Sequence, residues 1–326
     1  MSADLLLVGA GAMGAAYGQV LQELGMRFDV VGRGDLSAQS FETSLGLPVF
    51  RGGVGKWILQ RTGVLPGKAI VAIPSVEIGN VVEQLVHAGV RSILVEKPGG
   101  INAADVRSVA RFVDVTGADV RVAYNRRFYA STQFAREIIQ EDGGVSSFHF
   151  EFTEWGRVVA SSAVSPALLA EWFLNNSTHV ADLAFHLGGW PVQLSSFTAG
   201  STAWHPGSAV YAGAGIAETG ALFSYQANWS APGRWGVEVL TNSHRLIFRP
   251  MEKLQLQRLN SVAVEPVTID ENLDLRFKPG IYRQTEAFLN DDYRFLASIQ
   301  EQADRIVWYE QMARPDTHEV NRGSER

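Results

Sequence analysis

The 326-residue chain is long enough for two domains of ordinary size, and its 46% hydrophobic content excludes a disordered protein. A net charge of −6, with acidic and basic residues mixed along the chain, argues against nucleic acid or an anionic membrane as principal partner. The absence of cysteine excludes disulfides, thiol catalysis and cysteine-ligated metals. The first apolar run, LLLV, is too short for a signal sequence or a membrane span, so we expect a soluble cytoplasmic protein.

The first motif is a glycine-rich turn that follows this short apolar strand. Residues 4–14 read DLLLVGAGAMG, and a helical pattern of apolar residues comes next. A strand before and a helix after G-x-G-x-x-G is the context of the dinucleotide-binding fingerprint. Its glycines allow a tight turn, the approach of the pyrophosphate and close helix packing, and the helix N-terminus attracts the phosphates. We therefore expect the cofactor to contact Gly9, Gly11, Ala12, Met13 and Gly14.

The residues after the second predicted strand, Phe28–Val31, bear on the choice of cofactor. A carboxylate at this strand end favours NAD, whereas its absence beside an arginine favours NADP. Here Gly32 and Arg33 follow the strand, and a guanidinium can pair bidentately with a 2′-phosphate. NADP is therefore favoured over NAD, although the nearby Asp35 keeps NAD open.

Strands and helices alternate through the rest of the first third of the chain. Further buried strands are predicted at residues 69–73, 93–95 and 120–124, with helical patterns after the first two. This alternation implies right-handed crossovers and a parallel sheet, so we predict a Rossmann domain over residues 1–123. Ile73 and Pro74, at the end of one of these strands, are expected beside the cofactor.

The segment LVEKPGG, residues 94–100, places charged residues at the end of a predicted strand. The carboxyl ends of parallel strands are where open α/β sheets bind their ligands. Lys97 is therefore a candidate catalytic residue, and Glu96 is a candidate neighbour of the cofactor or a structural residue. Pro98 fixes the backbone and is a candidate cis proline, and the glycines release the chain into the next helix.

The second half of the chain changes pattern. Phe148, Phe150 and Phe152 alternate with polar residues, and several later segments alternate in the same way. Such strands predict a mostly antiparallel sheet with one open face. We predict a substrate-binding and oligomerisation domain over residues 124–305, a homodimer or homotetramer formed through the open sheet, and a helix end with a polar tail over residues 306–326. The last strong helix is predicted from about residue 282 to residue 299.

One helical segment of the second half carries an unusual set of polar residues. Helical spacing from about Ser177 places His179, Asp182 and His186 on one stripe beside an apolar face. Three readings stay open on spacing alone: a polar seam between helix and sheet, a metal site, or an acid/base role for His179 with Asp182 or Asn175 orienting the ring. The metal site is disfavoured because no further ligand is evident.

Three motifs together resemble a known family. GAGAMG at the start, EKP at residues 96–98 and YNRRF at residues 124–128 resemble the glucose–fructose oxidoreductase/inositol dehydrogenase (Gfo/Idh/MocA) family. The resemblance implies a Rossmann domain followed by an α/β domain with a large open sheet, often used for oligomerisation. It also implies oxidation or reduction of one hydroxyl of a sugar, sugar nucleotide or cyclitol with NAD(P). YNRRFY also resembles a branch of this family that is associated with bacterial surface-polysaccharide genes.

The resemblance also assigns roles to residues. The family motif D-x-x-x-H places its histidine on His179 and its aspartate on Asn175. An amide can orient an imidazole but does not stabilise imidazolium as a carboxylate does. The implied catalytic residues are Lys97, His179 and Asn175, and no metal is expected. The implied substrate-binding residues are Tyr124, Asn125, Arg126, Arg127 and Asp182, with one arginine gripping the substrate and the other structural.

The sequence therefore predicts an NAD(P)-dependent oxidoreductase acting on a secondary hydroxyl, or the matching ketone, of a sugar-like substrate. In oxidation His179 takes the hydroxyl proton, and Lys97 stabilises the developing alkoxide. The alternative is a cofactor-binding sensor of the same fold without turnover, which the replacement of the motif aspartate by Asn175 motivates.

Overall fold

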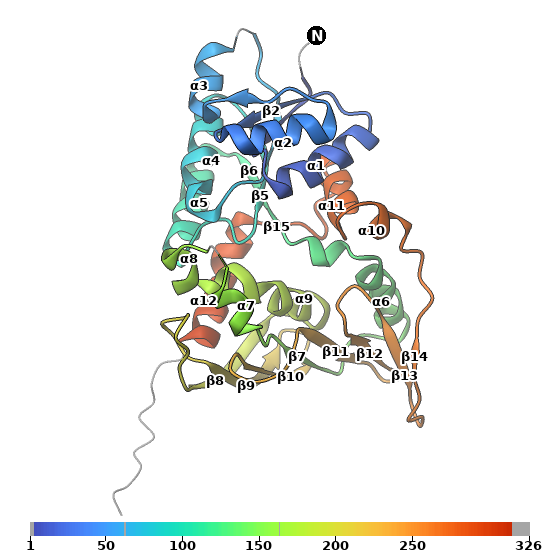
Figure 1. Ribbon diagram of the computed structural model, residues 1–326. Helices are drawn as coiled ribbons and strands as arrows, with labels where there is room; N and C mark the ends of the chain where they lie inside the picture. Colours follow the sequence, from blue (N-terminus) through green and yellow to red (C-terminus); the bar gives the residue numbers. More distant parts are fainter. Residues whose placement is uncertain (1–2, 62, 163, 315–326) are drawn as a thin grey trace, which may run out of the picture.

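The computed structural model describes residues 3–61, 63–162 and 164–314, which form two sheets at opposite ends of the molecule (Figure 1). The first sheet has the strand order β15-β6-β5-β4-β1-β2-β3. Its strands are β1 (Leu5–Val8), β2 (Phe28–Gly32), β3 (Phe50–Arg51), β4 (Lys68–Val71), β5 (Ser92–Glu96), β6 (Asp119–Ala123) and β15 (Ala297–Ser298). All neighbours pair in parallel except β15, which is antiparallel to β6. The predicted Rossmann sheet is confirmed.

Helices cover both faces of this sheet because its strands are apolar on both sides. Leu5 and Leu7 of β1 belong to one apolar cluster, and Leu6 and Val8 belong to the other. The helices of the first cluster are α1 (Ala12–Glu23), α2 (Asp35–Leu45) and α11 (Ile281–Leu289). The helices of the second are α3 (Gly53–Gln60), α4 (Ile78–His87, after the short η1, Ser75–Glu77), α5 (Ala103–Thr116) and α12 (Ile299–Ala313). In the described ranges, no helix is long and apolar enough to span a membrane.

The second sheet has the strand order β14-β13-β12-β11-β7-β10-β9-β8 and is mostly antiparallel, as predicted. Its strands are β7 (Ser147–Glu151), β8 (Pro191–Ala199), β9 (Val210–Ala217), β10 (Leu222–Asn228), β11 (Gly236–Leu240), β12 (His244–Phe248), β13 (Gln255–Arg258) and β14 (Val264–Pro266). The one parallel pair in it joins β7 to β10, so the strand that opens this half of the chain lies in the middle of the sheet. The fold class predicted from the sequence is confirmed.

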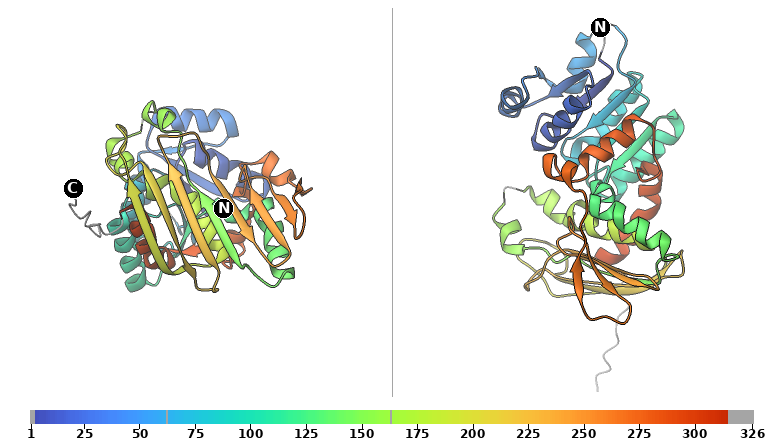
Figure 2. Two further views of the ribbon diagram at one scale, coloured as in Figure 1. Left: turned by 90° about the horizontal axis from the view of Figure 1, so that it is seen from below. Right: turned by 90° about the vertical axis from the view of Figure 1, so that its right-hand side faces the viewer.

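The two faces of the second sheet differ. Phe148 and Phe150 point inward and pack edge-on against Phe185 of α9 (Thr178–Gly188). The outer face carries exposed apolar side chains, including Phe197 and Leu222. Figure 2 shows this face from below, where no helix of the described chain covers it. The remaining helical segments are η2 (Asn125–Phe128), α6 (Ala130–Glu141), α7 (Gly156–Ala160), α8 (Pro166–Ala170), η3 (Phe173–Ser177) and α10 (Asn272–Arg276).

The single helix predicted over residues 282–299 is wrong. Helix α11 ends at Leu289, and α12 begins only at Ile299. Asp291 adopts a left-handed backbone with φ of 56°, which a helix cannot continue through. Ser298 and Glu301 then form a reciprocal capping box that starts the second helix. The chain after Arg314, which includes most of the predicted polar tail, lies outside the described residues.

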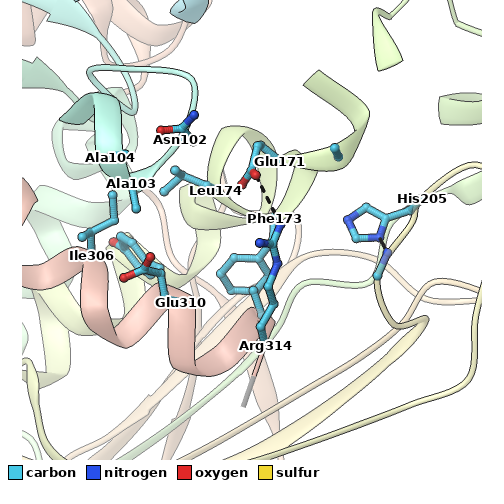
Figure 3. Close-up of a pocket in the computed structure, with 14 residues that line it drawn as sticks. Asn102, Ala103, Ala104, Glu171, Phe173, Leu174, His205, Ile306, Glu310 and Arg314 are labelled. Atoms are coloured by element: carbon cyan, nitrogen blue, oxygen red, sulfur yellow. Dashed lines mark hydrogen bonds and ion pairs between the residues drawn. The ribbon is translucent and has the colours of Figure 1, made fainter. Parts of the chain in front are cut away.

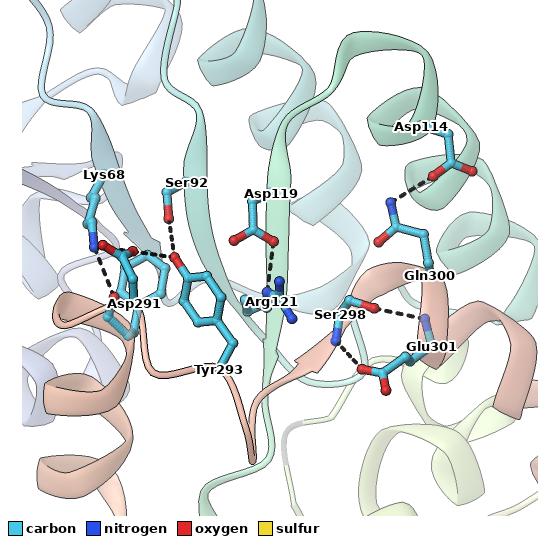
Figure 4. A network of polar contacts seen from close by, with 11 residues as sticks. Lys68, Ser92, Asp114, Asp119, Arg121, Asp291, Tyr293, Ser298, Gln300 and Glu301 are labelled. Carbon is cyan, nitrogen blue, oxygen red and sulfur yellow. Dashed lines mark hydrogen bonds and ion pairs between the residues drawn. The ribbon is translucent and has the colours of Figure 1, made fainter.

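The segment between these two helices is anchored to the amino edge of the first sheet (Figure 4). Lys68, the first residue of β4, donates to the carbonyl oxygen of Leu289 at 2.8 Å and to the Asp291 carboxylate at 2.6 Å. Tyr293 contacts the Ser92 hydroxyl at 3.3 Å and lies under the Arg121 guanidinium. These contacts lie at the opposite end of the strands from Lys97, so they hold the chain without entering the ligand-binding edge.

Replacing Phe150 by alanine should lower the free energy of unfolding by about 3–5 kcal/mol, because the ring is fully buried between Phe185 and Tyr225. Urea unfolding followed by tryptophan fluorescence measures this change. The control is Phe197→Ala on the outer face, where the ring is 66% exposed, and the expected change is within about 0.5 kcal/mol. Equal losses for the two variants would contradict the assignment of inner and outer faces.

Candidate active site

The glycine-rich turn after β1 leaves a backbone cradle. At Gly9, with φ of 114°, an added Cβ would lie 2.2 Å from the Ala72 carbonyl oxygen, and at Gly14 it would lie 1.9 Å from the Gly9 carbonyl oxygen. Both positions therefore require glycine, one for the turn and one for the packing of α1 on β1. At Gly11 an added Cβ would meet nothing within 4 Å. This open space lies where the fingerprint places the pyrophosphate.

The start of α1 supplies the anion-binding groups of this cradle. The helix begins at Ala12 with Gly11 as N-cap, and no side chain caps it. Uncapped N–H groups and the positive end of the helix dipole favour a phosphate here. Met13, in the first turn, receives the Lys278 ammonium at its sulfur at 2.8 Å. The backbone of the predicted cofactor residues therefore fits a dinucleotide.

A cavity of about 230 Å³ continues from the cradle between β2 and the end of β4. Its walls include Gly9, Gly11, Gly32, Gly34, Ser37, Ile73 and Pro74. Arg33 stands at the rim and forms an ion pair with Glu77, which lines the same cavity. The cavity thus joins four of the predicted cofactor residues (Gly9, Gly11, Ile73 and Pro74) to Arg33, and it has the place of an adenosine site in this fold.

Lys97 lies where β5 ends, next to the cradle, and its peptide bond to Pro98 is cis. Its ammonium donates to the backbone carbonyl oxygen of Asn175 in the second half of the chain. Burial is the largest influence and lowers the pKa of Lys97 to about 8, against the opposing effect of the Glu96 carboxylate. Lys97 is therefore mostly protonated at pH 7, but it holds its proton less firmly than an exposed lysine.

Glu96 is a structural neighbour of this site. Its carboxylate accepts a hydrogen bond from the Tyr17 hydroxyl of α1 at 3.1 Å. Burial raises the pKa of Glu96, and the Lys97 ammonium offsets part of this rise. The bond to Tyr17 ties the end of β5 to the helix that follows the cradle, and so relates the position of Lys97 to that of the cofactor site.

Asn175 does not orient His179, contrary to the role that the family motif implied. Its side-chain oxygen accepts from Ser75 at 2.8 Å, and its amide nitrogen donates to the carbonyl oxygens of Ile101 and Glu171 at 2.7 and 3.0 Å. The reason is local: η3 is a π-helical turn, so residues four apart across it are no longer aligned as in an α-helix. Asn175 instead joins the two halves of the chain.

His179, at the start of α9, lies among cations from both halves of the chain. Its Nδ1 is buried and has no hydrogen-bond partner among the described residues. The ring centroid is 6.0 Å from that of Trp235. Burial, followed by the charges of Arg126 and Lys97, holds the pKa of His179 well below its usual value. The imidazole is therefore neutral at pH 7, the form that accepts a proton.

Of the residues predicted to bind substrate, only Arg126 has a side chain without a hydrogen-bond partner within the described chain. Arg127 and Asp182 form a buried bidentate ion pair, with N–O distances of 2.5 and 2.8 Å. Tyr124 accepts from Gln302 at 3.0 Å, and Asn125 donates to the Pro279 carbonyl oxygen at 2.9 Å.

These bonds occupy both oxygens of Asp182, and the side chains of Tyr124, Asn125 and Arg127 are buried. The geometry therefore argues against a substrate-binding role for these four residues. The expectation that one arginine of the pair is structural fits Arg127. Burial lowers the pKa of Arg127, but Asp182 outweighs this effect, and the net shift is upward. The guanidinium is therefore charged, and the pair fixes α9 against η2.

The possible metal site of His179, Asp182 and His186 is not assembled. Asp182 is bound to Arg127, and His186 lies 3.1 Å from the Arg136 guanidinium and packs against the Phe295 ring. Burial and the charges of Arg127 and Arg136 lower the pKa of His186 well below its usual value. Among the residues with described positions, no group of three or more His, Cys, Asp or Glu could hold a metal ion.

A larger cavity, of about 420 Å³, lies away from these residues, between α5, α8 and α12 (Figure 3). An ion pair between Arg314 and Glu171 crosses it at 3.2 Å. Neither Lys97 nor His179 lines it. We therefore place the candidate active site at the junction of the two halves, where the charges of Lys97 and Arg126 act on His179. Asn175 links this junction to the cofactor side through its bonds to Lys97 and Ser75.

The comparison with solved structures finds the fold of this chain in several oxidoreductases. A UDP-N-acetylglucosamine 3-dehydrogenase from Acidithiobacillus ferrooxidans superposes with a TM-score of 0.72 at 13% identity, covering 94% of this chain and 95% of that chain. A levoglucosan dehydrogenase in complex with NADH and levoglucosan gives 0.74 at 17% identity, covering 94% and 95%. An NAD-binding oxidoreductase from Klebsiella pneumoniae gives 0.71 at 14% identity, covering 94% of each.

The chain has the fold of these oxidoreductases. The fold that the family resemblance implied, a Rossmann domain followed by a domain with a large open sheet, is thereby confirmed. No family model matches the sequence, and no curated protein matches it. The fold therefore rests on the structure, and the roles of individual residues rest on their surroundings.

Two residues of the site escaped sequence reasoning. Trp235 packs against His179, and the Lys278 charge reaches Glu96, Lys97 and His179. Both lie in short loops rich in glycine and proline, PGRWG and KPG. Such loops between periodic segments are common carriers of functional side chains, but nothing in their local pattern indicates which loop returns to the junction.

Asp182→Asn should lower the free energy of unfolding by about 3–5 kcal/mol, because it leaves the buried Arg127 charge without a counter-ion. Chemical denaturation at neutral pH measures this change. Asp4→Asn, which breaks an exposed pair with Arg27, is the matched control and should cost about 1 kcal/mol or less. A D182N variant as stable as D4N would mean that this ion pair does not hold α9 in place.

Proposed function

We propose that this protein is an NAD(P)-dependent oxidoreductase that transfers hydride to or from a secondary hydroxyl, or the matching ketone, of a sugar-like substrate. The observation that carries the proposal is that the Lys97 ammonium, at the end of β5, binds the backbone of Asn175, four residues before His179. Ser75, which follows Pro74 of the cofactor cavity, binds the side chain of the same Asn175. The shared fold with dehydrogenases of a sugar nucleotide and of levoglucosan supports it.

The residues present fit a nicotinamide dinucleotide. The backbone of Gly9, Gly11 and Ala12 would hold the pyrophosphate, and the cavity beside Arg33 would take the adenosine. When bound, the nicotinamide supplies or accepts the hydride. The protein positions the substrate and accepts or returns the proton of its hydroxyl.

The pKa shifts of His179 and Lys97 give the two residues different roles. His179 is neutral at pH 7, so in oxidation it takes the proton of the substrate hydroxyl. Lys97 is mostly charged, so it donates a hydrogen bond to the same oxygen and stabilises the alkoxide as it forms. In reduction the same groups act in the opposite sense, and His179 returns the proton.

The outer face of the second sheet is proposed as the surface of a homodimer or homotetramer. Val192, Phe197 and Leu222 expose apolar area on it, and nothing within the described chain covers them. Leu222 lies opposite the exposed Ile216 of β9, and exposed apolar area on an open sheet is a candidate subunit contact. The family resemblance implies the same use of the sheet.

Lys97→Met should lower kcat by about 10²–10³-fold, because one preorganised donor to the developing oxyanion is lost. Absorbance at 340 nm across a panel of sugars, sugar nucleotides and cyclitols measures turnover, and cofactor fluorescence measures binding. Cofactor affinity should stay nearly unchanged. Lys253→Met is the control and should leave turnover intact, because this exposed lysine pairs with Glu271 and lines neither the cofactor cavity nor the cavity of Arg126.

The pH profile gives an independent readout of Lys97. The charged form of Lys97 is the active one, so the wild-type rate of oxidation should fall as pH rises through about 8. Lys97→Arg should move this fall to higher pH, because a guanidinium keeps its proton. Undiminished turnover of K97M would sink the catalytic assignment. Cofactor binding by the wild type without turnover of any panel member would favour the sensor alternative.

We propose NADP as the preferred cofactor and Arg33 as the residue that binds its 2′-phosphate. Arg33→Gln should lower kcat/KM for NADP(H) by about 10-fold or more, because a charge-assisted bond to the 2′-phosphate is lost, and should affect NAD(H) less. Steady-state kinetics with both cofactors measures the ratio. Arg245→Gln, an exposed arginine of β12 paired with Glu238, is the control. Equal losses for the two cofactors would contradict the assignment.

A further inference from the structure

A second, smaller cavity lies next to His179 in the second half of the chain. Its volume is about 180 Å³, and its lining residues are Arg126, Arg234, Trp235, Arg249, Pro250, Met251 and Glu252. Trp235 lines this cavity and also packs against His179, with the two ring centroids 6.0 Å apart. The cavity therefore adjoins the proposed reaction centre and contributes three arginines to its surroundings.

Two of these arginines form no direct ion pair. Arg249 forms an ion pair with Glu151 at 2.9 Å, but neither Arg126 nor Arg234 takes part in an ion pair or a side-chain hydrogen bond within the described residues. Burial is the largest influence on the pKa of Arg126 and lowers it. Arg234 is exposed, whereas the Nε atom of Arg126 is buried, and a buried guanidinium nitrogen without an acceptor costs free energy.

Unpartnered buried nitrogen atoms gather at this place. Seven buried side-chain polar atoms have no hydrogen-bond partner in the described chain, and three of them are Arg126 Nε, His179 Nδ1 and Trp235 Nε1. Leaving a buried donor unsatisfied costs about 1–3 kcal/mol. All three atoms belong to side chains that meet at the Trp235 ring, and two of these side chains, Arg126 and Trp235, line the cavity. Unsatisfied donors of this kind favour a ligand that accepts hydrogen bonds.

Stacking on tryptophan holds the two free guanidinium groups. The Arg126 Cζ lies 5.0 Å from the Trp235 ring, and the Arg234 Cζ lies 4.5 Å from that ring and 4.6 Å from the Trp155 ring. Cation–π contact engages the plane of a guanidinium and leaves its N–H edge free. Such an edge binds a carboxylate or a phosphate in bidentate fashion.

Two carboxylates, Glu252 and Glu154, act on Arg126 through their charge without forming a direct ion pair with it. Glu252 lines the cavity but is exposed and forms no ion pair among the residues described. Glu154 uses one oxygen to accept from Asn176 at 2.9 Å and from Ser177 at 3.0 Å, and burial raises its pKa. The chain as a whole has a net charge of −6, so a cationic cavity is a local departure from its average.

We infer that Arg126 and Arg234 bind an anionic group of the substrate, a carboxylate or a phosphate, with Trp235 between this group and the reacting hydroxyl. The inference rests on the proposed function and narrows it: the substrate is an acidic sugar, a sugar phosphate or a diphosphate-linked sugar, and neutral sugars and cyclitols are excluded. Arg249 stays with Glu151 and closes the far side of the cavity.

The test compares four probes that differ in charge: glucose, glucuronate, glucose 1-phosphate and UDP-glucose. Turnover is followed at 340 nm with either cofactor, and binding to the cofactor-loaded protein is measured by calorimetry, which needs no turnover. We expect the wild type to bind at least one anionic probe at least 10-fold more tightly than glucose. The probe preferred among the three identifies the source of the anion.

Variants locate the site. Arg234→Gln should weaken binding of the preferred anionic probe, or raise its KM, by at least 10-fold with a smaller change in kcat. Arg234→Lys should recover part of the loss, since it keeps the charge but not the bidentate edge. Arg126→Gln should act in the same direction. Arg111→Gln, an exposed arginine on α5, removes the same charge far from the cavity and should change neither quantity.

The outcomes separate this inference from the proposed function. Turnover of glucose as efficient as that of every anionic probe, unaffected by R234Q, would overturn the inference and leave the oxidoreductase intact. Anion binding that R234Q and R126Q abolish, without turnover of any probe, would support the cavity and count against the enzyme. Anion binding that R111Q weakens as much as R234Q would overturn the cavity as its location.

Discussion

The buried ion pair between Arg127 and Asp182 is the constraint on which the candidate site depends. Arg127 follows the last parallel strand of the first sheet, and Asp182 lies on the helix that covers the second sheet. With both side chains almost fully buried, the pair tolerates little change in distance or angle. It therefore sets the position of α9, and with it that of His179, relative to the strand ends of the cofactor-binding half.

A second set of bonds joins the same two regions at the cofactor side. The Lys97 ammonium binds the backbone carbonyl of Asn175, and the Asn175 side chain holds Ser75 and the Ile101 carbonyl. Asn175 thus acts through its backbone and its amide as a connector. A neutral amide suits this work, since it both donates and accepts, which a carboxylate does not. The departure from the family motif therefore has a structural reason in this chain.

The electrostatics of the junction follow from this arrangement. Burial lowers the pKa of both groups, so His179 is neutral and Lys97 is mostly charged at pH 7. These are the protonation states that the two proposed roles require. Arg126 lowers both pKa values further, and stacking on Trp235 holds Arg126 and Arg234 together without a direct ion pair. Proton handling and anion binding are thus neighbouring parts of one electrostatic site.

Sequence reasoning was most successful where the pattern is periodic and local. The apolar strands, the glycine spacing and the alternating phenylalanines each follow from the geometry of one element, and they are sufficient for the parallel sheet, the cradle and the open second sheet. It failed where one residue interrupts a pattern. Asp291 ends a helix that periodicity would continue, and the π-helical turn at η3 separates Asn175 from His179 although four residues normally align them.

The sequence by itself determined the fold class, the cofactor cradle and the two residues proposed for the chemistry, Lys97 and His179, because these depend on short motifs and on the ends of predictable strands. Only the tertiary structure decided which of the two neighbouring arginines is engaged. Arg127 and Arg126 are adjacent in sequence, yet one faces Asp182 and the other faces Trp235. Partners of this kind lie more than 50 residues away, and burial and pairing arise only when the chain brings them together.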